Sequence, residues 1–194
     1  MKEIVIATKN PHKVTEMTNL LEPLWFDVKT LYDYPKLGPI DETGETFQEN
    51  ALIKAKTLSD ITGKAVISDD SGLEVVALDG APGVYSARFA GENVSYDDNN
   101  RMLLKKMKRK TDRSARFVTT ICYYQPGETP VFFTGTLNGK IAKDYKGLNG
   151  FGYDPLFIVK GTDKHLAEYS LIEKNEISHR AKALRKLIDY LKAS

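Results

Sequence analysis

The first 70 residues alternate between apolar runs with strand character and segments with helical spacing, and this order limits the folds open to the chain. The run EIVIAT stops at Asn10 and Pro11, an N-cap residue followed by the residue favoured at the first helical position. The patterns predict strands over residues 3–8, 25–31 and 64–70 and helices over 11–24 and 46–63. Strands that alternate with helices indicate βαβ units and a parallel sheet.

Beyond residue 70 the pattern changes to short apolar pieces separated by turn pairs such as Asp79-Gly80 and Pro82-Gly83. The sequence predicts a helix over 95–110, two long antiparallel strands over 114–125 and 129–142, a strand over 155–159 and a last helix that begins near Ser178. Asn138-Gly139 is a favoured hairpin pair, so we expect a turn into a further strand there. Residues 1–194 therefore read as one α/β domain with two lobes, a twisted mixed sheet flanked by helices.

Composition excludes several classes of function. The 194 residues include 28 basic and 26 acidic side chains, so no net field attracts nucleic acid or an anionic membrane. The basic run KKMKRK reads either as a nucleic-acid patch or as a solvated helix end. A single cysteine, Cys122, excludes an intramolecular disulfide and indicates the cytoplasm, and no apolar run is long enough for a signal or a membrane span.

Residues 8–13, TKNPHK, join the first predicted strand to the first helix. A helix N-terminus offers backbone N–H groups and a positive dipole end, and the side chains of Thr8, Lys9 and Lys13 add donors. The segment therefore predicts an anion site, with phosphate as the natural ligand. The alternative is an ordinary capped helix start, because no established phosphate-loop motif is present.

Asp69 and Asp70 end a buried strand, where two like charges repel and lose hydration. Successive strand residues point to opposite faces, so only one of the two reaches a given cleft. The segment 41–50 is also rich in acidic residues. Most of them are expected to stabilise the N-terminus of the second helix, and one that faces a cleft could bind a ligand. Carboxylates beside a phosphate turn suit Mg²⁺, whereas two carboxylates that merely cap a turn are the alternative.

Two further polar segments, 149–155 (NGFGYDP) and 173–182 (EKNEISHRAK), lie at predicted element ends. Phe151 stands among glycines that let a planar ligand approach the backbone. Arg180 and Lys182 open a helix against the dipole preference for acids, a departure that is typical of functional sites.

These segments together resemble the inosine/xanthosine triphosphate pyrophosphatase family. The motifs that carry the resemblance are TKNPHK, ETGETFQENALIKA, SDDSGLEVVALDGAPGVYSARFAG, GFGYDPLF and EKNEISHRAKAL. The resemblance implies an elongated mixed sheet with the substrate cleft between two lobes, and usually a homodimer. It implies hydrolysis of the deaminated purine nucleoside triphosphates ITP, dITP and XTP to monophosphate and pyrophosphate, with Mg²⁺ as cofactor.

The resemblance also implies a role for each matching residue. Asp70 is the expected general base and, with Glu42, the expected metal ligand. The expected substrate-binding residues are Thr8, Lys9, Asn10, Pro11, His12, Lys13, Lys54, Ser71, Phe151, Gly152, Tyr153, Asp154, Lys174, His179 and Arg180. His179 and Arg180 would donate to the oxygen at C6 of hypoxanthine or xanthine and leave the amino group of adenine unpaired. The rival hypotheses are a nucleotide-binding or sensor module without catalysis, a related pyrophosphatase that acts on modified pyrimidine nucleotides, and a general nucleotide phosphatase.

Overall fold

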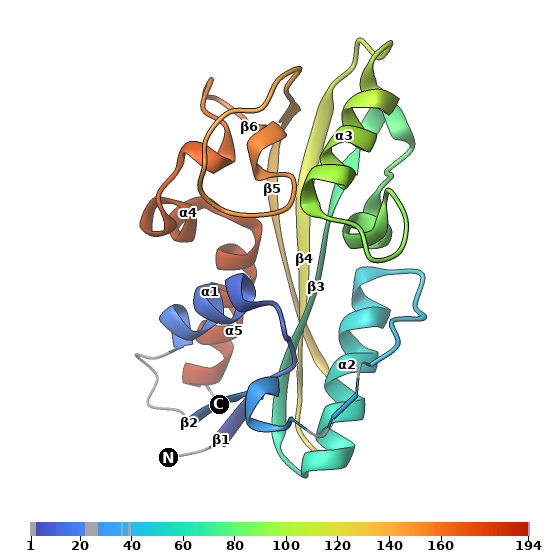
Figure 1. Ribbon diagram of the computed structural model, residues 1–194. Coiled ribbons are helices and arrows are strands. Elements are labelled where there is room, and N and C mark those ends of the chain that lie inside the picture. Colours follow the sequence, from blue (N-terminus) through green and yellow to red (C-terminus); the bar gives the residue numbers. More distant parts are fainter. Residues whose placement is uncertain (1–2, 22–26, 36, 39, 194) are drawn as a thin grey trace. The chain divides into compact units, whose positions relative to one another are not determined.

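The computed structural model describes residues 3–21, 27–35, 37–38 and 40–193. The strands are β1 (Glu3–Ile6), β2 (Asp27–Thr30), β3 (Ala65–Val75), β4 (Ser114–Tyr124), β5 (Val131–Ile141) and β6 (Phe157–Val159). The helices are α1 (Pro11–Leu21), α2 (Phe47–Thr62), α3 (Tyr96–Met107), α4 (Leu171–Ile177) and α5 (His179–Ala193). They confirm the predicted α/β class (Figure 1).

The strands form one six-stranded sheet in the order β2-β1-β3-β4-β5-β6. β1 pairs in parallel with both β2 and β3, as the βαβ pattern predicted, whereas β5 and β6 pair antiparallel. The sheet is therefore mixed.

The chain divides into two compact units. Unit 1 comprises Met1–Asp70, Thr119–Gly135 and Arg180–Ser194, and unit 2 comprises Ser71–Val118 and Thr136–His179. The long strands β3, β4 and β5 contribute residues to both units. The sequence-based expectation of a single domain stays a prediction.

Unit 1 has an apolar core on each face of its strands. On one face, Met17 of α1 and Leu184 and Leu187 of α5 pack with the buried residues Ile4 and Ile67. On the other face, three buried residues of α2 pack with Val5, Val66 and Cys122; they are Ala51, Ala55 and Leu58. Figure 1 shows the result, with α1 and α5 on one side of these strands and α2 on the opposite side. Residues at helical spacing thus cover both faces of the strands.

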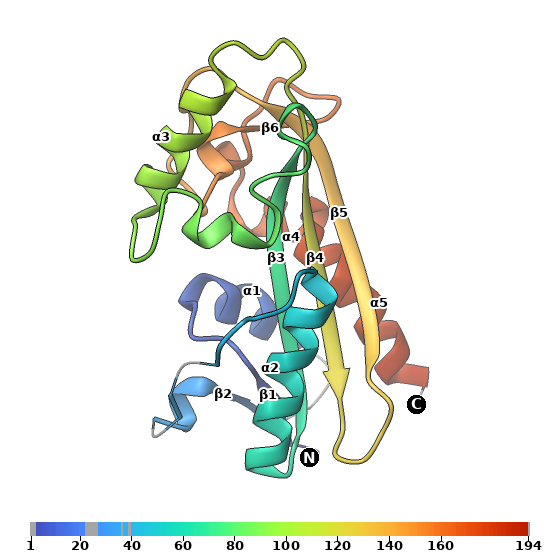
Figure 2. The same cartoon turned by 90° about the vertical axis from the view of Figure 1, so that its right-hand side faces the viewer.

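Unit 2 has a core of its own. Leu103 and Met107 of α3 are fully buried against Leu73 of β3, Phe117 of β4 and Phe157 of β6. Figure 2 shows α3 beside β3 in this unit. The core fixes α3 against the strands, and α3 in turn borders the segment that contains Phe151.

Local capping signals predicted the helix starts well. The capping boxes Thr46/Glu49 and Ser95/Asp98 are both formed, and Gly63 ends α2 in the left-handed conformation with φ of 66°. The proposed end of the first helix at Pro23 and the first two residues of the strand predicted over 25–31 lie outside the described residues. The strand predicted over 64–70 continues to Val75, so Asp69 and Asp70 lie within β3 and not at its end, and the short pieces expected after it are 3₁₀ turns over Val76–Leu78 and Gly83–Arg88.

The predicted turn at Asn138-Gly139 is wrong, because both residues lie inside β5. Gly139 pairs with Val159 of β6, and a Cβ built on Gly139 would lie 2.2 Å from the carbonyl oxygen of Ile158. The glycine is therefore needed for the close approach of two strands, not for a turn.

Helix α4 was not predicted. It starts at the capping box Ser170/Glu173, a Ser-x-x-Glu signal that is visible in the sequence. Ser178 ends α4, and α5 begins at the next residue, as predicted from the apolar spacing.

Candidate active site

The two adjacent aspartates of β3 lead to different surroundings, as strand alternation predicted. Asp69 interacts with Lys13 of α1 and Arg180 of α5, whereas Asp70 interacts with residues of α2 on the other face. Both carboxylates are at least nine-tenths buried and both lie in unit 1. Their chemistry therefore differs although their positions are consecutive.

Asp69 belongs to a buried ion cluster. Its Oδ2 lies 2.9 Å from Lys13 Nζ and 3.3 Å from Arg180 Nη2, and Arg180 Nη1 also donates to Glu16 Oε2 at 2.5 Å. Burial alone would raise the pKa of Asp69, but the charges of Lys13 and Arg180 outweigh it and hold that pKa well below its ordinary value. Asp69 is thus a permanently charged anchor for the two cations.

The negative charge of Asp70 has fewer and more distant cationic partners than that of Asp69. Its Oδ2 accepts from Asn50 Nδ2 at 3.2 Å, and its Oδ1 lies 3.7 Å from Lys54 Nζ. Burial raises the pKa of Asp70 to about 6, although the charge of Lys54 acts in the opposite direction. A carboxylate with a pKa near neutrality is suited to take up a proton during a reaction.

Glu42 and Asp70 converge on one ammonium group. Lys54 Nζ lies 2.9 Å from Glu42 Oε1 and 3.7 Å from Asp70 Oδ1. Burial opposes the charge of Lys54, yet Asp70, Asp69 and Glu42 together raise its pKa. Among the described residues there is no cluster of three or more His, Cys, Asp or Glu side chains that would hold a metal ion alone. Two carboxylates of this kind fit Mg²⁺ that takes its remaining ligands from water and substrate phosphates.

The turn over residues 8–13 is tightly bonded within itself. Asn10 Oδ1 accepts from the backbone N–H groups of His12 at 3.0 Å and Lys13 at 3.4 Å, and the Asn10 N–H donates to Thr8 Oγ1. The capped helix start, one of the two readings of the sequence, is therefore formed. Lys9 Nζ donates to the carbonyl oxygen of Leu37, while Pro11 begins α1. Of these side chains, Lys13 reaches the carboxylate cluster.

A second group of predicted residues comes together in unit 2. Lys174 Nζ lies 2.8 Å from Asp154 Oδ2 and 4.7 Å from the centre of the Phe151 ring. The same carboxylate oxygen accepts from the Phe151 N–H at 3.0 Å. A Cβ at Gly150, whose φ is +76°, would lie 2.1 Å from Asp154 Oδ2, so only glycine leaves room for this carboxylate. The Tyr153 hydroxyl donates to the carbonyl oxygen of Ser86.

The structure also locates Ser71, His179 and Arg180. Ser71 is the half-buried residue that follows Asp70 in β3. His179 stacks on Phe117 with ring centres 4.8 Å apart and is buried in unit 2. Arg180 is 1% exposed, and the carboxylates of Asp69 and Glu16 explain why a cation opens this helix. The role of His179 and Arg180 in base recognition stays a prediction.

Sequence reasoning missed Asn50 and Glu16. Asn50 accepts from the Gly44 N–H and donates to Asp70, and it lies four residues before Lys54 on the same face of α2. That spacing was a usable signal. Glu16 pairs with a residue 164 positions away, so no local pattern could have revealed it.

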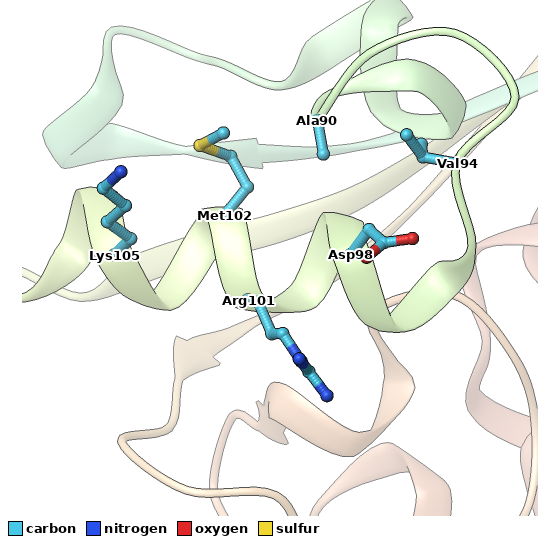
Figure 3. Close-up of a pocket in the computed structure, with 6 residues that line it drawn as sticks. All are labelled: Ala90, Val94, Asp98, Arg101, Met102 and Lys105. Atoms are coloured by element: carbon cyan, nitrogen blue, oxygen red, sulfur yellow. The ribbon is translucent and has the colours of Figure 1, made fainter.

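A separate pocket in unit 2 is lined by Ala90, Val94, Asp98, Arg101, Met102 and Lys105. Figure 3 shows the Met102 side chain on the same side of α3 as Ala90, whereas Arg101 points to the opposite side. These lining residues include none of the predicted site residues. The two clusters described above are therefore the better candidates.

The sequence that carries these motifs matches a known family. The model of the Ham1 family matches residues 4–190. The chain belongs to the Ham1 family. Its sequence-based resemblance to inosine/xanthosine triphosphate pyrophosphatases is thereby confirmed. No helix in the described part of the chain is long and apolar enough to cross a membrane.

Named relatives in the Ham1 family are similar over nearly their whole length. A dITP/XTP pyrophosphatase of an Exiguobacterium species is 52% identical, covering 95% of this chain and 94% of the relative. The dITP/XTP pyrophosphatase of Bacillus subtilis is 48% identical, covering 100% and 98%. The Ham1 protein structure from Coxiella burnetii has a TM-score of 0.93 at 39% identity, covering 100% of each chain. The Staphylococcus aureus Ham1 structure has a TM-score of 0.90 at 43% identity, covering 99% of each.

Proposed function

We propose that this protein hydrolyses ITP, dITP and XTP to the nucleoside monophosphate and pyrophosphate, and so removes deaminated purines from the nucleotide pool. The observation that carries the proposal is that the adjacent carboxylates of Asp69 and Asp70 have different partners and different pKa values. Asp69 is charged and paired with cations, whereas Asp70 is buried beside Glu42 and Lys54 with a pKa of about 6. Mere nucleotide binding requires no such base.

Asp70 is the general base of the proposed reaction. The oxygen of a water molecule forms a bond to the α-phosphorus, and the bond from that phosphorus to the bridging oxygen breaks, which releases pyrophosphate. The proton of the water passes to Asp70. Asn50 orients the carboxylate through its hydrogen bond to Oδ2 at 3.2 Å.

The leaving pyrophosphate requires positive charge around it. Lys13 and Lys54 are held close by Asp69 and Glu42, at 2.9 Å in each case. We assign both lysines to the triphosphate, together with the turn over residues 8–13. Asn10 Oδ1 accepts from the backbone N–H groups of His12 and Lys13, so these two groups can donate to phosphate only after the Asn10 side chain moves aside.

Asp70 and Glu42 are the residues that would hold Mg²⁺. Both carboxylates already approach one cationic group, the ammonium of Lys54, so a second cation at this point would balance them. When bound, Mg²⁺ supplies positive charge to the phosphate oxygens. The identity of the metal is part of the proposal.

The cluster in unit 2 is assigned to the base and the sugar. Phe151 offers a ring face for stacking, and Lys174 and Asp154 hold the segment that carries it. Ser71, Gly152 and Tyr153 complete the proposed substrate contacts, with His179 and Arg180 as the predicted donors to the base. The printed names of the relatives, dITP/XTP pyrophosphatase, support this choice of substrate.

The test uses the purified chain with Mg²⁺ and each of ITP, dITP, XTP, GTP and ATP, with pyrophosphate separated from orthophosphate. We expect pyrophosphate from the first three and little product from GTP and ATP. Orthophosphate as the product would contradict attack at the α-phosphorus, and binding without turnover would favour a sensor. The homodimer, the substrate cleft between lobes and the cytoplasmic location expected from the sequence stay predictions.

A further inference from the structure

Helix α3 holds the segment 150–154 through two residues one helical turn apart. The Tyr96 ring lies 6.0 Å from the Phe151 ring, centre to centre, and Asn100 Nδ2 donates to the carbonyl oxygen of Gly152 at 2.9 Å. Residues spaced by four share one face of a helix, so this face of α3 is directed at the segment. Figure 2 shows α3 beside the orange segment that leads into β6.

The hydrogen bond from Asn100 fixes the direction of the Gly152 carbonyl. Asn100 is 3% exposed, so a carbonyl that accepts from its amide faces the interior of unit 2. The Oδ1 atom of Asn100 is buried with no hydrogen-bond partner among the described residues, which is unfavourable for stability. The hydrogen bond from Nδ2 to Gly152 is therefore the contact of the Asn100 amide that explains why an asparagine stands at this position.

Three other acceptors of the segment also have partners within unit 2. The carbonyl oxygen of Phe151 accepts from the Asp154 N–H at 3.3 Å, and that of Tyr153 accepts from the Leu156 N–H at 2.9 Å. Asp154 Oδ2 accepts from Phe151 and Lys174. The segment thus carries an aromatic ring, while the carbonyl oxygens of Phe151, Gly152 and Tyr153 and the Oδ2 atom of Asp154 each have a partner inside unit 2.

The occupied acceptors bear on which base the segment can bind. Adenine, guanine and cytosine each carry an exocyclic amino donor, whereas hypoxanthine and xanthine carry none. An amino group that enters a site without an acceptor loses its hydrogen bond to water and is disfavoured. Hypoxanthine and guanine share the ring N1–H donor and differ only by the amino group at C2, so a site in which these acceptors are already occupied favours hypoxanthine over guanine.

We propose that Asn100 is a specificity-determining residue, which withdraws the Gly152 carbonyl from the base site and thereby disfavours guanine nucleotides relative to hypoxanthine nucleotides. The inference rests on the proposed function, because it takes the segment around Phe151 as the base site. It is isolated by comparing guanine with hypoxanthine, since these two bases differ only by the amino group at C2.

Asn99 offers a matched control on the same helix. It is also 3% exposed, and it bonds to the loop that precedes α3 by donating to the Ala87 carbonyl oxygen at 3.0 Å and accepting from the Ala90 N–H at 2.8 Å. Asn99→Ala thus removes buried amide hydrogen bonds of α3 without touching Gly152. Asn100→Leu serves as a second variant, since it removes the donor but keeps most of the side-chain volume.

The experiment measures kcat/KM for ITP and for GTP in the wild type, Asn100→Ala, Asn100→Leu and Asn99→Ala. We expect the ITP-to-GTP ratio to fall about fivefold to tenfold in either Asn100 variant, the loss that one neutral hydrogen bond predicts, and to stay within twofold in Asn99→Ala. A ratio within twofold of the wild type in folded, active Asn100 variants overturns the inference. So does an equal fall in Asn99→Ala.

Variants that fold but do not hydrolyse nucleotide are tested by binding. Dissociation constants for IMP and GMP are compared, and the same fall in discrimination is expected, whereas an unchanged ratio overturns the inference. The wild-type protein distinguishes failure of the proposed function from failure of the role of Asn100. If it releases no pyrophosphate from ITP, the proposed function fails, while an unchanged ratio in active variants leaves that function intact and removes only the role of Asn100.

Discussion

Asp69 and Asp70 are consecutive in β3, yet Asp69 Oδ2 lies 2.9 Å from Lys13 Nζ, while Asp70 Oδ2 lies 3.2 Å from Asn50 Nδ2. The first carboxylate is saturated with cationic partners, and the second is buried with less compensation. The same substitution at the two positions should therefore have different effects on activity and opposite effects on stability.

Asp70→Asn should reduce kcat for ITP at least a hundredfold, because the amide cannot accept the proton. Binding of the substrate should weaken far less, since Asn retains the shape and the contact to Asn50. Steady-state kinetics and an equilibrium dissociation constant measure the two quantities. Asp60→Asn, on the exposed face of α2, is the control and should change neither. Equal losses in turnover and binding would contradict the role of a base.

The pKa of Asp70 is raised and that of Asp69 is lowered, so the two carboxylates should change the free energy of unfolding of the metal-free protein with pH in opposite directions. Asp70 has a raised pKa in the folded state, so its favourable contribution is present below about pH 4 and is lost as the pH rises through about 6. Asp70→Asn should therefore stabilise at pH 7.5, on the order of 2 kcal/mol, with a gain that shrinks toward pH 4. Denaturant unfolding at several pH values measures this. A destabilised Asp70→Asn protein at pH 7.5 would refute the assignment.

Asp69→Asn should destabilise the protein at neutral pH by about 3 kcal/mol, because it leaves Lys13 and Arg180 buried with too little negative charge. The lowered pKa of Asp69 means that its contribution is present above the ordinary aspartate pKa and is lost only as the pH falls toward the folded value. The effect should thus be constant from pH 6 to 8 in the same unfolding experiments. A neutral Asp69→Asn substitution would show that the cluster contributes no net stability.

The two types of ion pair in unit 2 should be easy to tell apart. Lys174→Met breaks a pair whose side chains are each 4% exposed, and should cost about 3 kcal/mol of unfolding free energy. Lys164→Met is the matched control, since its pair with Glu173 at 3.4 Å is largely exposed and should be worth less than about 1 kcal/mol. If Lys174 belongs to the base site, its loss should weaken IMP binding but leave pyrophosphate binding unchanged. Equal effects on both ligands would argue against that assignment.

Lys54→Met should raise KM for ITP about tenfold, because one cation near the triphosphate is lost and Glu42 no longer has its partner at 2.9 Å. Lys56→Met, an exposed lysine on the same helix, should have no effect. Initial rates over a range of substrate concentrations at fixed Mg²⁺ measure the change. A normal KM in Lys54→Met would remove this lysine from the proposed phosphate site.

Sequence patterns predicted those features that depend on neighbours along the chain. The capping boxes at Thr46 and Ser95 and the opposite directions of Asp69 and Asp70 follow from backbone geometry over a few residues. The same reasoning failed at Gly139, where the local preference for a turn is overridden by the close approach of β6. Tertiary contacts decide such cases, and they leave no local signal.

The candidate site was predictable in its residue types but not in its pairings. The family motifs indicated Lys13, Asp70 and Lys54, whereas the bonds from Arg180 to Glu16 and Asp69 join residues more than 100 positions apart. Asn100 is a similar case, since its partner Gly152 is 52 positions away. Only the folded chain brings such partners together.

The contact between Asp69 and Lys13 also bears on the entropy of binding. A free lysine side chain loses roughly 2 kcal/mol of rotamer entropy when a ligand orders it. Lys13 is only 15% exposed and is already directed by Asp69, so most of this ordering takes place when the chain folds. A phosphate group that arrives meets a cation with few remaining rotamers, and its affinity is reduced little by the restriction of that side chain.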